Sequence, residues 1–173
     1  EGTAVVLANN GAFVFMLVEY CCQEKNLNSL TLIIDECIKC KYLPASQDGL
    51  TKTFITCINK SCTALDFSFA LQIAKIGIKL STNQLGEKAK KVIELAFQDL
   101  IDKARKANDN STELTSIESL IEEFKSFDKS RALLVEANLC IERDKLEDAY
   151  DIFNTILALP GIETSIKESA SLE

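Results

Sequence analysis

The chain has 173 residues, 47% of them hydrophobic, so it can bury a continuous core, and the composition excludes a disordered chain. The net charge is −7, and the acidic excess lies in residues 87–173, where 19 Asp and Glu face 12 Lys and Arg. Phosphate-binding surfaces normally carry a basic stripe, so this charge disfavours direct nucleic-acid binding. Only two prolines and six glycines occur, which favours an all-α fold of helices joined by short turns.

The first predicted hairpin covers about residues 12–46. Apolar residues recur at helical spacing in its first helix, and those expected on the buried face are Phe13, Leu17, Tyr20 and Cys21. Lys25 and Asn26 form a polar turn. The second helix carries an apolar face of Leu30, Ile33, Ile34, Cys37 and Ile38, and it ends before Pro44. A loop with Asp48 and Gly49 as its turn follows.

A second hairpin is predicted at about residues 51–81, with a turn within Thr63–Asp66. Its first helix has an apolar stripe of Phe54, Cys57, Ile58 and Cys62, and its second has Phe67, Ala70, Leu71, Ala74 and Ile78. Residues 86–127 form less regular helices. They comprise a long helix over about 86–107, a polar loop at 108–112, and a helix that Thr115 and Glu118 open as a capping box.

A third hairpin is predicted at about residues 131–161, closed by Pro160 and Gly161. Its stripes are Leu133, Leu134, Ala137 and Cys140, then Leu146, Ala149, Ile152, Phe153 and Ile156. Ser165 and Glu168 form a capping box for one more helix from Ile166. We expect residues 1–173 to form a single helical-repeat domain that is a fragment of a longer chain.

The three hairpins share a pattern when their turns are aligned. Equivalent positions are Cys22 and Cys62, then Leu30, Ala70 and Ala149, then Ile33, Ile73 and Ile152. The first hairpin, with Cys22 and Pro44, resembles the pentatricopeptide repeat. The third, with Ala149, Phe153 and Pro160, is as similar to the related tetratricopeptide repeat. This resemblance implies antiparallel helical hairpins stacked as a short right-handed α-solenoid.

The resemblance implies two functions. Pentatricopeptide proteins bind single-stranded RNA in mitochondria or chloroplasts, with two positions of each repeat reading one base. These positions fall on Met16 and Ser46, then on Thr56 and Gly86. Methionine cannot supply the hydrogen bonds that select a base, and of the four only Thr56 is suitable. Tetratricopeptide proteins instead hold protein partners on a concave surface, which suits the acidic second half better.

We therefore expect a non-catalytic module that acts as a protein-interaction scaffold, within an organellar RNA-handling assembly. Direct binding of single-stranded RNA is the alternative, and a small regulatory bundle without a groove is a third. A gathering of basic side chains on one concave face would favour RNA; the candidates are Lys39, Lys41, Lys52, Lys60 and Lys75.

No catalytic or metal site is predicted. The chain has seven cysteines and no histidine, and six cysteines lie among apolar residues in the first 62 positions. We read them as small core residues in a reducing compartment, either the cytoplasm or the mitochondrial matrix. Cys37-x-x-Cys40 could be half of a zinc site, but zinc needs two more ligands. With no run of about 20 apolar residues, no glycine-rich phosphate loop and no histidine base, we expect no membrane insertion, no cofactor and no enzyme activity.

Overall fold

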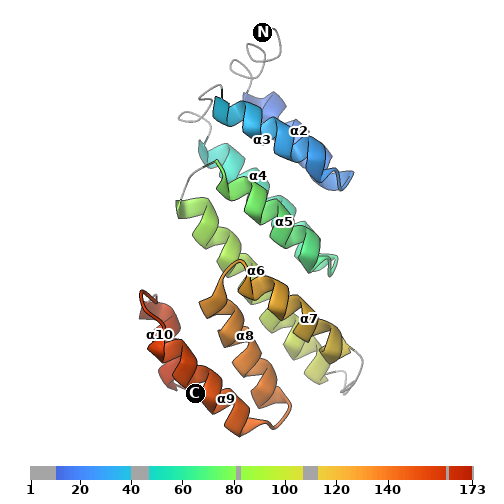
Figure 1. Cartoon of the computed structure of the whole chain (residues 1–173). Helices are drawn as coiled ribbons and strands as arrows, with labels where there is room; N and C mark the ends of the chain where they lie inside the picture. The colour runs from blue at the N-terminus through green and yellow to red at the C-terminus, as the bar shows by residue number, and fades with distance from the viewer. Residues whose placement is uncertain (1–10, 40–46, 81–82, 107–112, 163, 173) are drawn as a thin grey trace. The chain divides into compact units, whose positions relative to one another are not determined.

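A computed structural model describes residues 11–39, 47–80, 83–106, 113–162 and 164–172 (Figure 1). In these residues the chain forms nine α-helices and no strand, which confirms the all-α prediction. The contacts within the chain group it into two compact units, Glu1–Ile93 and Glu94–Glu173, and the single helical-repeat domain stays a prediction. Each unit is described by itself.

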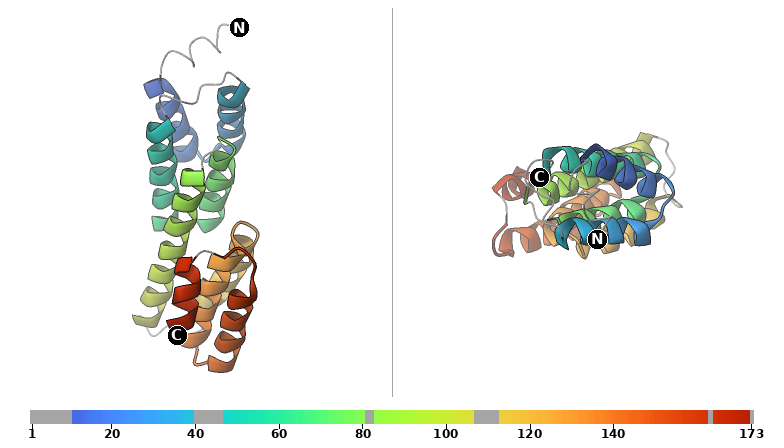
Figure 2. Two further views of the ribbon diagram at one scale, coloured as in Figure 1. Left: turned by 90° about the vertical axis from the view of Figure 1, so that its left-hand side faces the viewer. Right: turned by 90° about the horizontal axis from the view of Figure 1, so that it is seen from above.

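The first unit contains two helical hairpins. Their helices are α2 (Gly11–Gln23), α3 (Leu27–Lys39), α4 (Gln47–Thr63) and α5 (Phe67–Ile78). Helix α2 packs against α3 and α4, and α5 packs against α3 and α4. The first helices of the two hairpins therefore form one layer and the second helices form another, as the left view of Figure 2 shows. This stacking agrees with the expected hairpin order, while the right-handed solenoid stays a prediction.

The second unit contains the later helices. Helix α6 (Asn83–Lys106) begins in the first unit and ends in the second. It is followed by α7 (Glu113–Lys125), α8 (Lys129–Glu142), α9 (Leu146–Ala158) and α10 (Thr164–Leu172). Helix α8 packs against α7, α9 and α10, and α10 also packs against α9. The Phe97 ring of α6 stacks on the Phe124 ring of α7, with 5.6 Å between their centroids.

The three aligned hairpins turn in the same way. The middle residue of each three-residue connector has a positive φ: 52° at Lys25, 61° at Leu65 and 61° at Asp144. Its N–H donates to the carbonyl three residues earlier, and the next N–H donates to the carbonyl five residues earlier. This pair of bonds is the Schellman motif, which satisfies carbonyls that a helix end would otherwise leave unpaired. We call residues 24–26, 64–66 and 143–145 the Schellman connectors.

The last residue of a connector also begins the following helix. The side chain of Asn26 accepts a hydrogen bond from the Ser29 N–H at 3.0 Å, and Asp66 accepts one from the Phe69 N–H at 3.2 Å. These are N-caps, which supply acceptors for the unpaired donors of the first helical turn. The third connector ends in Lys145, which makes no side-chain cap. Three residues thus close one helix and open the next.

The aligned positions are buried in the same register. In the second helix of each hairpin the buried residues include Leu30, Ile34 and Cys37, then Ala70, Ala74 and Gly77, then Ala149, Phe153 and Ile156. The predicted equivalence of Leu30, Ala70 and Ala149 is confirmed at the level of burial. At the second predicted set, Ile73 is buried while Ile33 and Ile152 are half-buried, and in the third set Cys62 is buried while Cys22 is half-buried.

Gly77 lets α5 approach α4 closely. A Cβ atom at Gly77 would lie 2.8 Å from Cδ1 of Phe54, so even one methyl group would clash with that ring. The Phe54 side chain is fully buried and fills the space that a larger residue at position 77 would need. The corresponding positions of the other hairpins hold Cys37 and Ile156.

Several local predictions were wrong. In α2 the buried residues include Val14 and Val18, whereas Phe13 and Tyr20, which were predicted to be buried, are exposed. Because this helix is apolar nearly all round, the spacing of its apolar residues does not indicate which face is buried. Asp48 and Gly49 lie in the first turn of α4 and not in a loop. Thr115 lies inside α7 and Ser165 inside α10, so both helices begin earlier than the capping-box pattern predicts. The predicted loop at 108–112 lies outside the described residues.

The second unit contains a buried ion pair. Arg131 of α8 donates from Nη1 to Oε2 of Glu94 in α6 at 2.6 Å, and the two side chains are 6% and 4% exposed. The backbone N–H of Arg131 also donates to the side-chain Oδ1 of the N-cap residue Asp128 at 3.1 Å. Desolvating two charges is costly, and removing one partner leaves the other charge buried without compensation.

We expect Arg131→Met to lower the free energy of unfolding by about 3–5 kcal/mol, because Glu94 then stays buried without the positive charge of Arg131. Urea unfolding followed by circular dichroism measures this. The double variant Glu94→Leu/Arg131→Met removes both charges and should recover most of the loss. A double variant as unstable as the single one would show that the ion pair itself carries the stability.

We expect Leu65→Gly to stabilise the first unit by about 0.5–1 kcal/mol, since an exposed L-residue at positive φ is strained and glycine is not. The matched control is Ala64→Gly in the same connector. Its backbone lacks the positive φ, so it should lose stability by a similar amount. Thermal unfolding of both variants checks the opposite signs.

Candidate functional site

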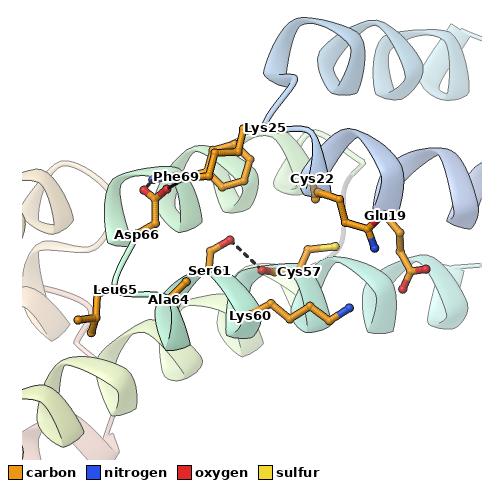
Figure 3. Close-up of a pocket in the computed structure, with 11 residues that line it drawn as sticks. Glu19, Cys22, Lys25, Cys57, Lys60, Ser61, Ala64, Leu65, Asp66 and Phe69 are labelled. Atoms are coloured by element: carbon orange, nitrogen blue, oxygen red, sulfur yellow. Dashed lines mark hydrogen bonds and ion pairs between the residues drawn. The ribbon is translucent and has the colours of Figure 1, made fainter.

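A pocket of about 450 Å³ opens between the two hairpins of the first unit (Figure 3). Helices α2 and α4 contribute side chains that include Glu19, Cys22, Cys57 and Lys60. The connectors at 24–26 and 64–66 contribute Lys25, Ala64, Leu65 and Asp66, and α5 contributes Phe69. The pocket exists because α2 stacks on α4 in register, which brings the two Schellman connectors next to each other.

An ion pair joins the two connectors at the pocket. The Lys25 Nζ atom donates to Oδ2 of Asp66, and it lies 5.7 Å from the centre of the Phe69 ring. The hydrogen bond from Lys25, helped by the Phe69 N–H, holds the pKa of Asp66 below its ordinary value. Asp66 therefore caps α5 and pairs with the neighbouring hairpin at the same time.

Two thiols meet on the side of the pocket formed by α2 and α4. Cys22 and Cys57 are hydrogen-bonded to each other. This bond, together with burial, raises the pKa of Cys22, and accepting it lowers the pKa of Cys57. The positive charge of Lys60 also lowers the pKa of Cys57.

The pocket is lined by an ion pair and by an apolar surface. Its Lys25 and Asp66 neutralise each other, and its apolar surface comes from Ala64, Leu65 and Phe69. Its volume of about 450 Å³ is in the range of small ligand sites. Among the described residues, no group of three or more Cys, Asp or Glu side chains is placed to hold a metal ion.

The residues predicted to read bases do not form this site. Met16 of α2 and Thr56 of α4 hold equivalent positions and are exposed, and the Thr56 hydroxyl donates to the Lys52 carbonyl at 2.9 Å. Ser46 lies outside the described residues. Gly86 is buried in α6, with Ile78 within 3.8 Å of the place its Cβ would take, so it offers no surface for a base.

The basic candidates and the cysteine motif are also dispersed. Lys52 and Lys60 belong to α4 in one layer, whereas Lys39 of α3 and Lys75 of α5 belong to the other. Lys39 pairs with Glu36 at 2.6 Å. Lys41 and Cys40 lie outside the described residues, and Cys37 is fully buried. Of the four candidate lysines that the structure describes, only Lys60 lines the pocket.

The sequence interpretation missed Lys25, Asp66 and Phe69 as site residues. The sequence pattern predicts Lys25 and Asn26 only as a polar turn, and Asp66 only as the end of a turn. The signal was present, because Asn26 and Asp66 occupy the same N-cap position in aligned hairpins. Stacking those hairpins in register places Lys25 beside Asp66.

The comparisons with known proteins add no family. No family model, curated protein or solved structure matches this chain. Among the described helices, none is both long enough and apolar enough to span a membrane.

We expect Asp66→Asn to lower stability at pH 7 by about 0.2–1 kcal/mol, because asparagine keeps the N-cap but loses the ion pair with Lys25. The folded-state pKa of Asp66 lies below its ordinary value of 3.8, so this contribution is present above pH 3.8 and disappears as pH falls through the folded-state pKa. Urea unfolding of both proteins from pH 7 to pH 2 measures the difference. A difference that persists at pH 2 would contradict the assignment.

Proposed function

We propose that the chain is a non-catalytic helical-repeat module that acts as a protein-interaction scaffold, and that the pocket between its first two hairpins receives side chains of a protein partner. The observation that carries this proposal is the pocket itself, which is built jointly by α2, α4, α5 and two connectors. Helical-repeat proteins bind partners on surfaces that neighbouring repeats create together.

The lining of the pocket favours a peptide. Ala64 and Leu65 are exposed at the connector and offer apolar contact, and the Phe69 ring lies beneath the ammonium group of Lys25. The Lys25–Asp66 pair fixes that ammonium group before a partner arrives. Preorganised side chains lose less conformational entropy on binding, which increases affinity. Glu19 and Lys60 add one charge of each sign and can pair with polar groups of the peptide.

Charge placement favours a protein over RNA. Phosphate groups need a continuous positive surface, and the described lysines that were candidates are divided between the two layers of the first unit. In the pocket Lys25 is paired with Asp66, and Glu19 stands near Lys60 in the same lining. We propose that the chain works within an organellar RNA-handling assembly. Other members of that assembly would make the contact to RNA.

We expect Ala64→Trp to abolish capture of a specific partner, because the indole fills the pocket while leaving the helices intact. The control is Thr63→Trp, since Thr63 is exposed next to Ala64 but does not line the pocket. Both variants and the natural chain are used as baits in cell extract, with and without nuclease, and captured proteins are quantified by mass spectrometry.

Proteins that survive nuclease, bind the Thr63→Trp chain and are lost from the Ala64→Trp chain support the proposal. Capture that disappears with nuclease would favour the RNA alternative. Capture that Ala64→Trp leaves unchanged would exclude the pocket as the binding site.

A further inference from the structure

Helix α9 carries a row of large apolar side chains that face solvent. Leu146 is 61% exposed, Tyr150 67% and Leu157 41%. At 100° per residue these three positions fall within about 40° of arc, so they form one row along the helix. We call Leu146, Tyr150 and Leu157 the α9 row. It covers three turns and runs for about 16 Å at 1.5 Å per residue.

The same register is covered in another hairpin. The residues of α5 that align with the α9 row are Phe67, Leu71 and Ile78. Phe67 is 1% exposed and Leu71 is fully buried, while Ile78 is half-buried. In α3 the middle position holds Thr31, and the row is only partly covered. The aligned positions are thus apolar and mostly covered in α5, whereas in α9 they are apolar and exposed.

The edge of the α9 row is acidic. Helix α9 contains Glu147, Asp148 and Asp151 and no basic residue, and all three acids are exposed. On the helix Glu147 and Asp151 lie about 60–100° beyond the row on its solvent side. Lys145 precedes the first turn, outside the helix. An apolar row with an acidic border is complementary to an apolar row with a basic border.

We propose that the α9 row docks an amphipathic α-helix of a protein partner, and that this helix carries apolar residues at i, i+4 and i+7 beside lysine or arginine. Helix-in-groove recognition commonly uses this spacing, because such residues share one face. The inference deepens the proposed scaffold function, but it uses residues other than those of the pocket. The acids select the basic partner, and the leucines and Tyr150 supply the buried area.

The test uses two synthetic peptides of about 18 residues, long enough to span the row. Both have leucine at i, i+4, i+7 and i+11. One carries lysine at the flanking positions, and the other carries glutamate there. Fluorescence anisotropy of the labelled peptides against the chain of residues 1–173 measures affinity. We expect the lysine peptide to bind at least about tenfold more tightly than the glutamate peptide, with the advantage falling as salt rises.

Three variants connect the binding to the surface. Tyr150→Glu should weaken the lysine peptide at least about tenfold, because it places a charge in the apolar row. Glu147→Lys/Asp151→Lys should reverse the preference between the two peptides. Leu32→Glu is the matched control, since Leu32 of α3 is 65% exposed and should leave binding unchanged. All substituted positions are exposed, and circular dichroism checks that each variant folds.

Equal affinity for both peptides, or binding that Tyr150→Glu leaves unchanged, would overturn the inference. Self-association in sedimentation experiments that Tyr150→Glu abolishes would also overturn it, since a second copy would then be the occupant. The Ala64→Trp chain separates the two proposals. It should bind the lysine peptide normally, so failure of the pocket and failure of the α9 row give different results.

Discussion

The Schellman connector is the constraint on which the hairpins depend. Each connector must reverse the chain in three residues, satisfy the carbonyls of the helix before it and begin the helix after it. Those tasks require one residue with a positive φ, and the chain uses lysine, leucine and aspartate there instead of glycine. The strain is tolerated because the two backbone bonds and the packed helices on both sides hold the conformation. Once the turn is fixed, so is the register of the second helix, which explains why Leu30, Ala70 and Ala149 are all buried.

The candidate site follows from that register. Because α2 packs on α4, the connectors of consecutive hairpins become neighbours, and a side chain from one can reach the cap of the next. Asp66 stabilises both its own hairpin and the contact between hairpins. It caps its own helix and binds Lys25 of the preceding hairpin. A pocket at such a junction belongs to two repeats at once. The shape of the pocket therefore depends on how the two hairpins stack. A partner that fills the pocket would stabilise the stacked arrangement.

Sequence patterns predicted helices well and side-chain surroundings less well. The helices of the three hairpins and the alignment at Ala70 and Ala149 followed from apolar spacing, which reflects burial directly, and the turns of the first two hairpins followed from their polar residues. The buried face of α2 did not, because a helix that is apolar nearly all round has no preferred face until its neighbours are known. The Glu94–Arg131 pair and the Cys22–Cys57 pair join different helices, so no local pattern indicates them. Base-reading positions were transferred from a resemblance, and Gly86 is buried where that transfer needs an exposed residue.

Gly77 limits how far the hairpins are interchangeable. At matched positions the first hairpin holds Val14 and Cys37, which are both fully buried, and the second holds Phe54 in contact with Gly77. In the second hairpin the large side chain is on the first helix and the second helix has no side chain opposite it, whereas in the first hairpin both helices carry a side chain of medium size. Exchanging α5 for α3 would place a cavity beside Val14 or a clash beside Phe54, although both helices obey the same register. The residue at position 77 therefore has to match the residue at position 54, and the two helices of a hairpin are exchangeable only together.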